Sequence, residues 1–68
     1  MNVLIIRPED DTKKGWWTVM ECLPHKGEQM YFMGKSYDIS MVKYFMGASD
    51  IKEYNGKTPF ARIMLMNQ

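Results

Sequence analysis

Cys22 and His25 are the residues of this chain whose types and spacing come closest to catalytic chemistry. A histidine beside a cysteine can take the thiol proton and so produce a thiolate nucleophile. Here Pro24 separates the pair, and His25 falls in a predicted turn with no third group placed to orient its ring. We therefore interpret Cys22 as a buried strand cysteine and His25 as an exposed turn residue, and we predict no catalytic residue.

A second chemical pattern is Gly34–Ser36, which matches the end of a phosphate-binding loop. The complete pattern requires another glycine five residues before Gly34, and this chain has Gln29 at that position. The neighbouring segments are also too short for the parallel strand and long helix that hold such a loop. Nucleotide hydrolysis is therefore not predicted.

Metal binding has little support in the residue types available. Structural zinc sites take about four cysteine or histidine ligands, and Cys22 and His25 are the only residues of those types in the sequence. The acidic run Glu9–Asp11 could attract a hard cation, but no spaced set of further oxygen ligands follows it. We interpret this run as a solvated loop, and we predict no metal, no cofactor and no enzymatic activity.

The stretch from Lys13 to Trp17 combines cations with large aromatic rings. Platforms for single-stranded nucleic acid use this combination, and each stacked base contributes about 1–3 kcal/mol. The residues that would carry such binding are Lys13, Lys14, Trp16, Trp17 and Tyr31. A chain this small also needs a large aromatic side chain in its core. The favoured interpretation is therefore that one tryptophan is buried and the other covers its edge.

Methionine is unusually frequent, at eight of 68 residues. Its side chain adapts to irregular surfaces and is common at binding faces. Alternation along the last predicted strand places Ala61, Ile63 and Leu65 on one face and Phe60, Met64 and Met66 on the other, interrupted by Arg62. If one face is uncovered, its apolar stripe marks an interface. The predicted protein contacts are Trp16, Trp17, Phe60, Arg62, Met64 and Met66.

Length and charge narrow the function classes further. The 68 residues fit a single domain, 1–68, whose core is marginal unless a partner or self-association reinforces it. A net charge of +1, from nine basic and eight acidic residues, argues against a dedicated duplex-DNA binder. The apolar run Val3–Ile6 is far shorter than the roughly 18 residues of a membrane span. We expect a soluble cytoplasmic protein with no membrane partner.

Five strands and one helix are predicted to position these residues. The predicted strands are Val3–Ile6, Trp16–Leu23, Gln29–Met33, 50–54 and 57–66. Val3–Ile6 is apolar throughout, which is typical of a strand covered on both faces. The segment His25–Glu28 is predicted to join the second and third strands as a hairpin loop, and Asn55–Gly56 to join the last two.

The helix is predicted over about 37–46, within the segment Ser36–Gly47. Its apolar residues recur at helical spacing, at Ile39, Val42, Phe45 and Met46. Polar residues able to cap a helix precede it, and Gly47 is placed to end it. Its first part, 36–41, also alternates between apolar and polar residues, so a strand there stays open as an alternative.

These elements predict an α+β domain in the order β-β-β-α-β-β, with a five-stranded, mostly antiparallel sheet and one helix. A small OB-like barrel, which has its helix at the same place in the chain, is the alternative arrangement. We expect a non-catalytic module that binds another protein or its own copy, as an inhibitor or accessory factor. Small phage accessory proteins are generically of this size. The alternative function is binding of single-stranded nucleic acid.

Overall fold

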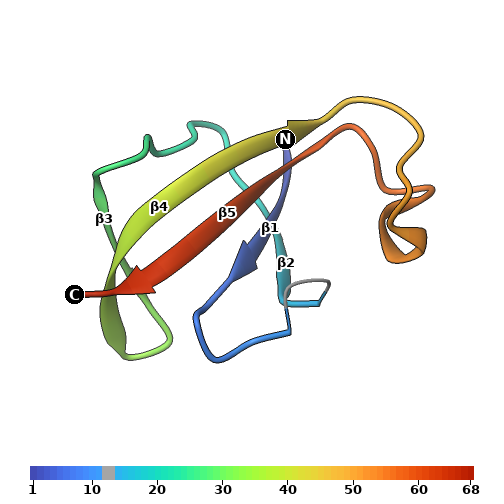
Figure 1. The fold of residues 1–68 in the computed structure, drawn as a ribbon. Coiled ribbons are helices and arrows are strands. Elements are labelled where there is room, and N and C mark those ends of the chain that lie inside the picture. The colour runs from blue at the N-terminus through green and yellow to red at the C-terminus, as the bar shows by residue number, and fades with distance from the viewer. Residues whose placement is uncertain (12–13) are drawn as a thin grey trace.

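The structure, a computed structural model, describes residues 1–11 and 14–68. Its elements are β1 Asn2–Ile6, β2 Trp16–Val19, β3 Gln29–Phe32, β4 Lys35–Phe45, the short 3₁₀ helix η1 Lys52–Tyr54, and β5 Phe60–Asn67. The strands form one sheet in the order β2-β1-β5-β4-β3 (Figure 1). β1 and β5 run parallel, whereas the other three neighbouring pairs are antiparallel, so the sheet is mixed.

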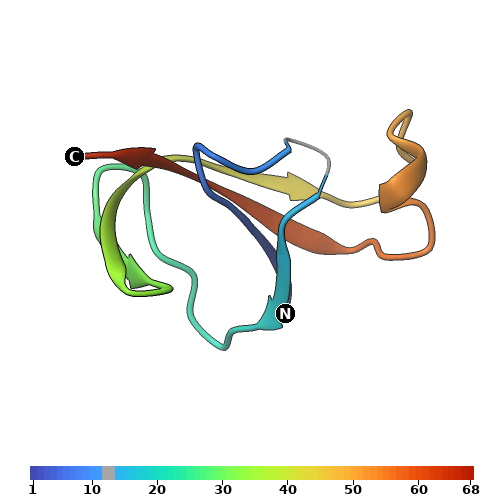
Figure 2. The same ribbon diagram turned by 90° about the horizontal axis from the view of Figure 1, so that it is seen from below.

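The sheet curls into half of a barrel around its concave face. Val3, Ile5 and Ile63 are buried in the middle of that face. Met20, which follows β2, and Met30 of β3 pack against this same cluster, although β2 and β3 lie at opposite edges of the sheet. Both edges therefore bend toward one side, and β4 shows the bend as it approaches β3 (Figure 2).

The convex face is covered at one end by the segment that carries η1. Leu4, Ile6 and Phe60 are buried there, and Tyr54 of η1 packs against them. The segment extends beyond the paired ends of β4 and β5 (Figure 1). Since β1 supplies buried side chains to both faces, the prediction that Val3–Ile6 forms a strand covered on both sides is confirmed.

The predicted helix over about 37–46 is wrong, because this segment is the greater part of β4, an 11-residue strand. The described residues include no α-helix, so the α+β class and the β-β-β-α-β-β order are also wrong, and the fold is nearly all β. The pairing of β4 with β5 shifts by one residue between Ile39 and Met41, which is a β-bulge. The bulge places Val42, not Met41, on the same face as Ile39, and a spacing of three residues imitates a helix.

Both predicted hairpins are wrong as well. β2 ends at Val19, and the segment after it crosses to β3 at the far edge of the sheet. The segment 50–54, predicted as a strand, contains η1. The loop that contains η1 is closed by a polar side chain of its own, because Asn55 Oδ1 accepts a hydrogen bond from the Ser49 N–H at 3.1 Å. Among the described strands none pairs with the outer side of β2 or of β3, so the sheet is not the closed OB-like barrel either.

The loop after β1 is held by an ion pair between Arg7 and Asp10. The Nη2 and Nε atoms of Arg7 donate to the two carboxylate oxygens of Asp10 at 2.9 and 3.0 Å, and the Arg7 backbone N–H donates to Oδ2 at 3.0 Å. The side-chain hydrogen bonds from Arg7, followed by its backbone N–H, hold the pKa of the Asp10 carboxyl below its usual range.

The stabilisation from this ion pair should disappear in acid. The pKa of Asp10 is lower in the folded than in the unfolded chain, where it is about 3.9. The contribution is therefore present above about pH 4 and is lost as the pH falls through the folded-state pKa. We expect Asp10→Asn to lower the free energy of unfolding in urea by about 1–2 kcal/mol at neutral pH, and to have a smaller effect in acid, once the carboxyl is protonated in the folded chain.

The control for this prediction is Asp50→Asn, since Asp50 is exposed. Its free energy of unfolding should follow that of the unsubstituted chain within about 0.5 kcal/mol at both pH values. An Asp10→Asn effect of the same size at neutral and acidic pH would show that the carboxylate charge contributes nothing.

Candidate binding groove

Trp17 lies on the convex face, held by the buried rings beneath it. The register of β2 against β1 places it opposite Leu4, so its side chain projects to the convex side. Its ring centroid is 4.8 Å from that of Phe60 and 6.5 Å from that of Tyr54, both edge to face. The residue is still 38% exposed. Packing thus fixes one side of the indole and still leaves part of the residue accessible to a partner.

The rings under Trp17 form a compact aromatic cluster. Phe60 and Tyr54 are fully buried, and their centroids are 5.0 Å apart. Phe45 stacks on Phe60 at 4.9 Å and meets Tyr54 at 5.1 Å. Offset and edge-to-face pairs of this kind contribute about 0.5–1.5 kcal/mol each beyond the area that they bury. The cluster therefore gives Trp17 a rigid support.

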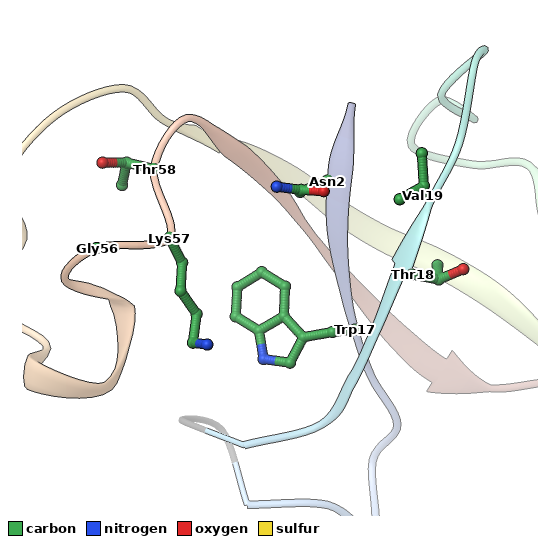
Figure 3. A pocket seen from close by; sticks show the side chains of 7 residues that line it. All are labelled: Asn2, Trp17, Thr18, Val19, Gly56, Lys57 and Thr58. Atoms are coloured by element: carbon green, nitrogen blue, oxygen red, sulfur yellow. The ribbon is translucent and has the colours of Figure 1, made fainter.

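A groove opens beside Trp17, between β2 and the loop that precedes β5 (Figure 3). Its lining consists of Asn2, Trp17, Thr18, Val19, Gly56, Lys57 and Thr58. The indole reaches from β2 toward Lys57, whose side chain extends from the facing loop (Figure 3). Lys57 Nζ lies 5.2 Å from the indole centroid. Val19, 69% exposed, continues the apolar side of the groove along β2.

The groove presents a charged group and neutral polar groups beside its apolar surface. Lys57 is the charged side chain among its described lining residues, and Asn2 and Thr58 add neutral polar groups. The cation–π contact with Trp17 is worth about 0.5–1 kcal/mol at an exposed site, so it orients the ammonium group without removing it from solvent. None of the described lining residues is a histidine, a cysteine or a carboxylate. An apolar wall beside one cation is complementary to a ligand that carries an apolar group next to a carboxylate.

The predicted protein contacts do not share one exposed stripe. Trp16 projects to the concave side, opposite to Trp17, and is 54% exposed. Phe60 is fully buried in the aromatic cluster. Met64 is partly buried at the edge of that cluster, and Met66 is exposed further along β5. Trp17 is therefore the predicted contact that lies at the groove.

Arg62, the predicted polar anchor, supports the aromatic cluster instead of reaching into solvent. Its guanidinium carbon lies 5.1 Å from the ring centroid of Phe45 and 6.0 Å from that of Tyr54. Its Nη1 donates to the Tyr54 hydroxyl at 3.3 Å. The Nε atom is buried without a hydrogen-bond partner among the described residues. The two ring faces offset part of the cost of that burial.

The residues predicted to bind nucleic acid are not brought together. Trp16 and Trp17 project to opposite faces of β2, and Tyr31 lies on β3 at the other edge of the sheet. Lys14 lines a different hollow with Trp16. Lys13 lies outside the described residues. A stacking platform built from both tryptophans is therefore not formed by this arrangement.

The earlier candidates for catalysis and metal binding lie elsewhere. Cys22 is exposed, so its predicted burial is wrong, whereas His25 is exposed as predicted. The Nδ1 atom of His25 lies 3.4 Å from a carboxylate oxygen of Glu28. No three metal-ligating side chains gather anywhere in residues 1–11 and 14–68. Within the same described part of the chain, no helix has the length and apolar character to cross a membrane.

Sequence reasoning missed most of the groove. Val19 had a usable signal, because it follows Trp17 by two residues in a predicted strand and so shares its face. Lys57 had none. It reaches Trp17 only because β5 pairs in parallel with β1, which brings the loop before β5 next to the start of β1. Asn2 and Thr58 enter the groove for the same reason.

No protein-family model, curated protein or solved structure matches this chain.

Proposed function

We propose that this chain is a small non-catalytic module that binds another protein through the groove beside Trp17. The observation that carries the proposal is the position of Trp17, which is packed on Phe60 and Tyr54, flanked by Lys57 and still exposed. Rigid aromatic side chains next to a charged group are typical of residues that dominate binding energy at interfaces. A fixed indole also loses little side-chain entropy when a partner covers it.

The charge of the groove points to the chemistry of the partner. Trp17 and Val19 offer apolar surface, and Lys57 offers a cation that no described lining residue neutralises. We infer a partner segment that carries an apolar side chain beside an acidic one. We place the module in the cytoplasm in this proposal, since its one cysteine, Cys22, is free and exposed, which suits a reducing compartment. Its action would be that of an inhibitor or accessory factor.

Reversing the charge of Lys57 should weaken the complex. The partner is captured from a lysate of the cells that encode this chain, purified, and titrated calorimetrically. We expect Lys57→Glu to raise the dissociation constant at least about tenfold, because a carboxylate of the partner would then face a carboxylate. The matched control is Lys52→Glu, an exposed lysine of η1 outside the groove. It should change the dissociation constant less than about twofold.

An equal effect of both substitutions, or of neither, would contradict a role for the groove. The alternative function is checked separately, by tryptophan fluorescence during titration with a thymine oligonucleotide at low and moderate salt. The proposal expects no quenching at protein concentrations well above micromolar. Quenching that weakens with salt would favour single-stranded nucleic acid as the ligand.

A further inference from the structure

β2 is an open edge of the sheet without the usual protection. It stands at one end of the strand order, and all four of its residues are exposed. Within the described part of the chain, no strand pairs with its outer side. Natural edge strands are commonly protected by lysine, proline or a bulge. The sequence of β2, Trp-Trp-Thr-Val, has none of these and consists of strong β formers.

The backbone groups that face outward follow from the hydrogen bonds at the end of β2. The Met20 N–H donates to the Met1 carbonyl at 3.0 Å, and the Met1 amino group donates to the Met20 carbonyl at 3.0 Å. Bonded and non-bonded pairs alternate along an antiparallel ladder. Thr18 therefore bonds inward to Val3. Trp17 and Val19 then direct their N–H and C=O groups away from β1, toward the open edge.

We propose that β2 pairs antiparallel with β2 of a second copy of this chain, about a two-fold axis at Thr18. Trp17 of each copy then lies opposite Val19 of the other, and the two residues exchange both backbone hydrogen bonds. The same pairs join an aromatic with a β-branched side chain on the convex face. Thr18 meets its own symmetry mate on the concave face. Both kinds of cross-strand pair are favourable.

Charge supports a second copy as the occupant of this edge. Continued past the two ends of β2, the proposed register brings Glu21 of one copy near Lys14 of the other. Both charged residues are exposed, so opposite charges meet at each end of the paired segment. The dimer would continue the two sheets as one and place both Trp17 grooves on the same convex side. The proposed dimer goes beyond the proposed function and does not depend on the identity of the partner that the groove binds.

Sedimentation velocity with charge-swapped variants tests the pairing. The paired segment is short, so the dissociation constant should lie between about 0.1 and 1 mM. Thr18→Lys and Thr18→Glu each place like charges on the two-fold axis, and each variant should be monomeric at about 1 mM. An equimolar mixture of the two should recover the dimer. Tyr31→Lys, on the other edge strand, should dimerise like the unsubstituted chain.

Disulfide formation gives a second measurement. Non-bonded antiparallel pairs have Cα atoms about 4.5 Å apart, which a disulfide can bridge. In a Cys22→Ser background, Thr18→Cys should form a disulfide-linked dimer in air at least about tenfold faster than Tyr31→Cys.

Three results would overturn the proposal. The first combines two observations. The unsubstituted chain is monomeric at about 1 mM, and Thr18→Cys forms the disulfide-linked dimer no faster than Tyr31→Cys. Another is a dimer that persists in Thr18→Lys. The third is a mixture of the charge variants that stays monomeric. Lys57→Glu separates this inference from the proposed function, because it should lose the partner of the groove and still dimerise.

Discussion

Phe60→Ala is expected to lower the free energy of unfolding by about 3–5 kcal/mol. No part of Phe60 is exposed, and its ring lies within 5.0 Å, centroid to centroid, of those of Trp17, Phe45 and Tyr54. Truncation would leave a cavity that the sheet beneath cannot fill, because Leu4 and Ile6 are held in β1, which is paired on both sides. A domain of this length has a total stability of about 3–10 kcal/mol. The substitution should therefore remove most of it.

Urea unfolding followed by circular dichroism and tryptophan fluorescence measures this loss. Phe60→Leu keeps much of the volume and should cost about 1–1.5 kcal/mol. Met66→Ala, at an exposed position on the same strand and face, should change stability by less than about 0.5 kcal/mol. If Phe60→Ala were no more harmful than Met66→Ala, the aromatic cluster would not support the convex face. The support of Trp17, and with it the proposed groove, would then also be in doubt.

Local patterns in the sequence were sufficient to predict the two parallel strands, β1 and β5. Val3–Ile6 is apolar throughout because β1 lies between β2 and β5 and is covered on both faces. The alternation of Ala61, Ile63 and Leu65 correctly places three buried residues on one face of β5. Phe60, predicted on the other face as part of a contact stripe, is fully buried instead. These assignments need only the two-residue period of a strand, which acts within a few residues.

The wrong prediction of a helix over about 37–46 has a local cause in β4, which the apolar pattern of the sequence does not reveal. Ser40 lies at the bulge, and its Oγ donates to the Met64 carbonyl at 3.0 Å, across to β5. The bulge shifts the period by one residue, so Ile39 and Val42 share a face at a spacing that also fits a helix. A two-residue period that is interrupted once cannot be distinguished from a short helix without knowledge of the pairing strand.

The sheet order and the groove depend on contacts between distant residues. Nothing near Trp16 or Trp17 indicates which one faces the aromatic cluster, because that depends on the register of β2 with β1. Lys57 reaches Trp17 across 40 residues of chain, through the parallel pairing of β1 with β5. The sequence therefore identified an aromatic site but neither its face nor its cation.

Gly15→Ala is expected to lower the free energy of unfolding by about 2–4 kcal/mol, for two reasons that add. The residue has φ +154°, a conformation that favours glycine. An added Cβ would also lie 2.5 Å from the Ile5 carbonyl oxygen and 3.0 Å from Ile6 Cγ1. The oxygen belongs to the backbone of buried β1 and cannot move aside without displacing that strand. Urea unfolding, as for Phe60, measures the effect.

Two other glycines separate the effect of backbone conformation from the effect of the close contact with β1. Gly27 has φ +92° with nothing within 4 Å of an added Cβ, so Gly27→Ala should cost about 1 kcal/mol from backbone strain alone. Gly47 has neither a positive φ nor a close neighbour, and Gly47→Ala should be neutral or stabilising by up to about 1 kcal/mol. Equal losses for Gly15→Ala and Gly27→Ala would contradict the close approach to β1. A larger loss at Gly15 would measure the close approach of the residue before β2 to the backbone of β1.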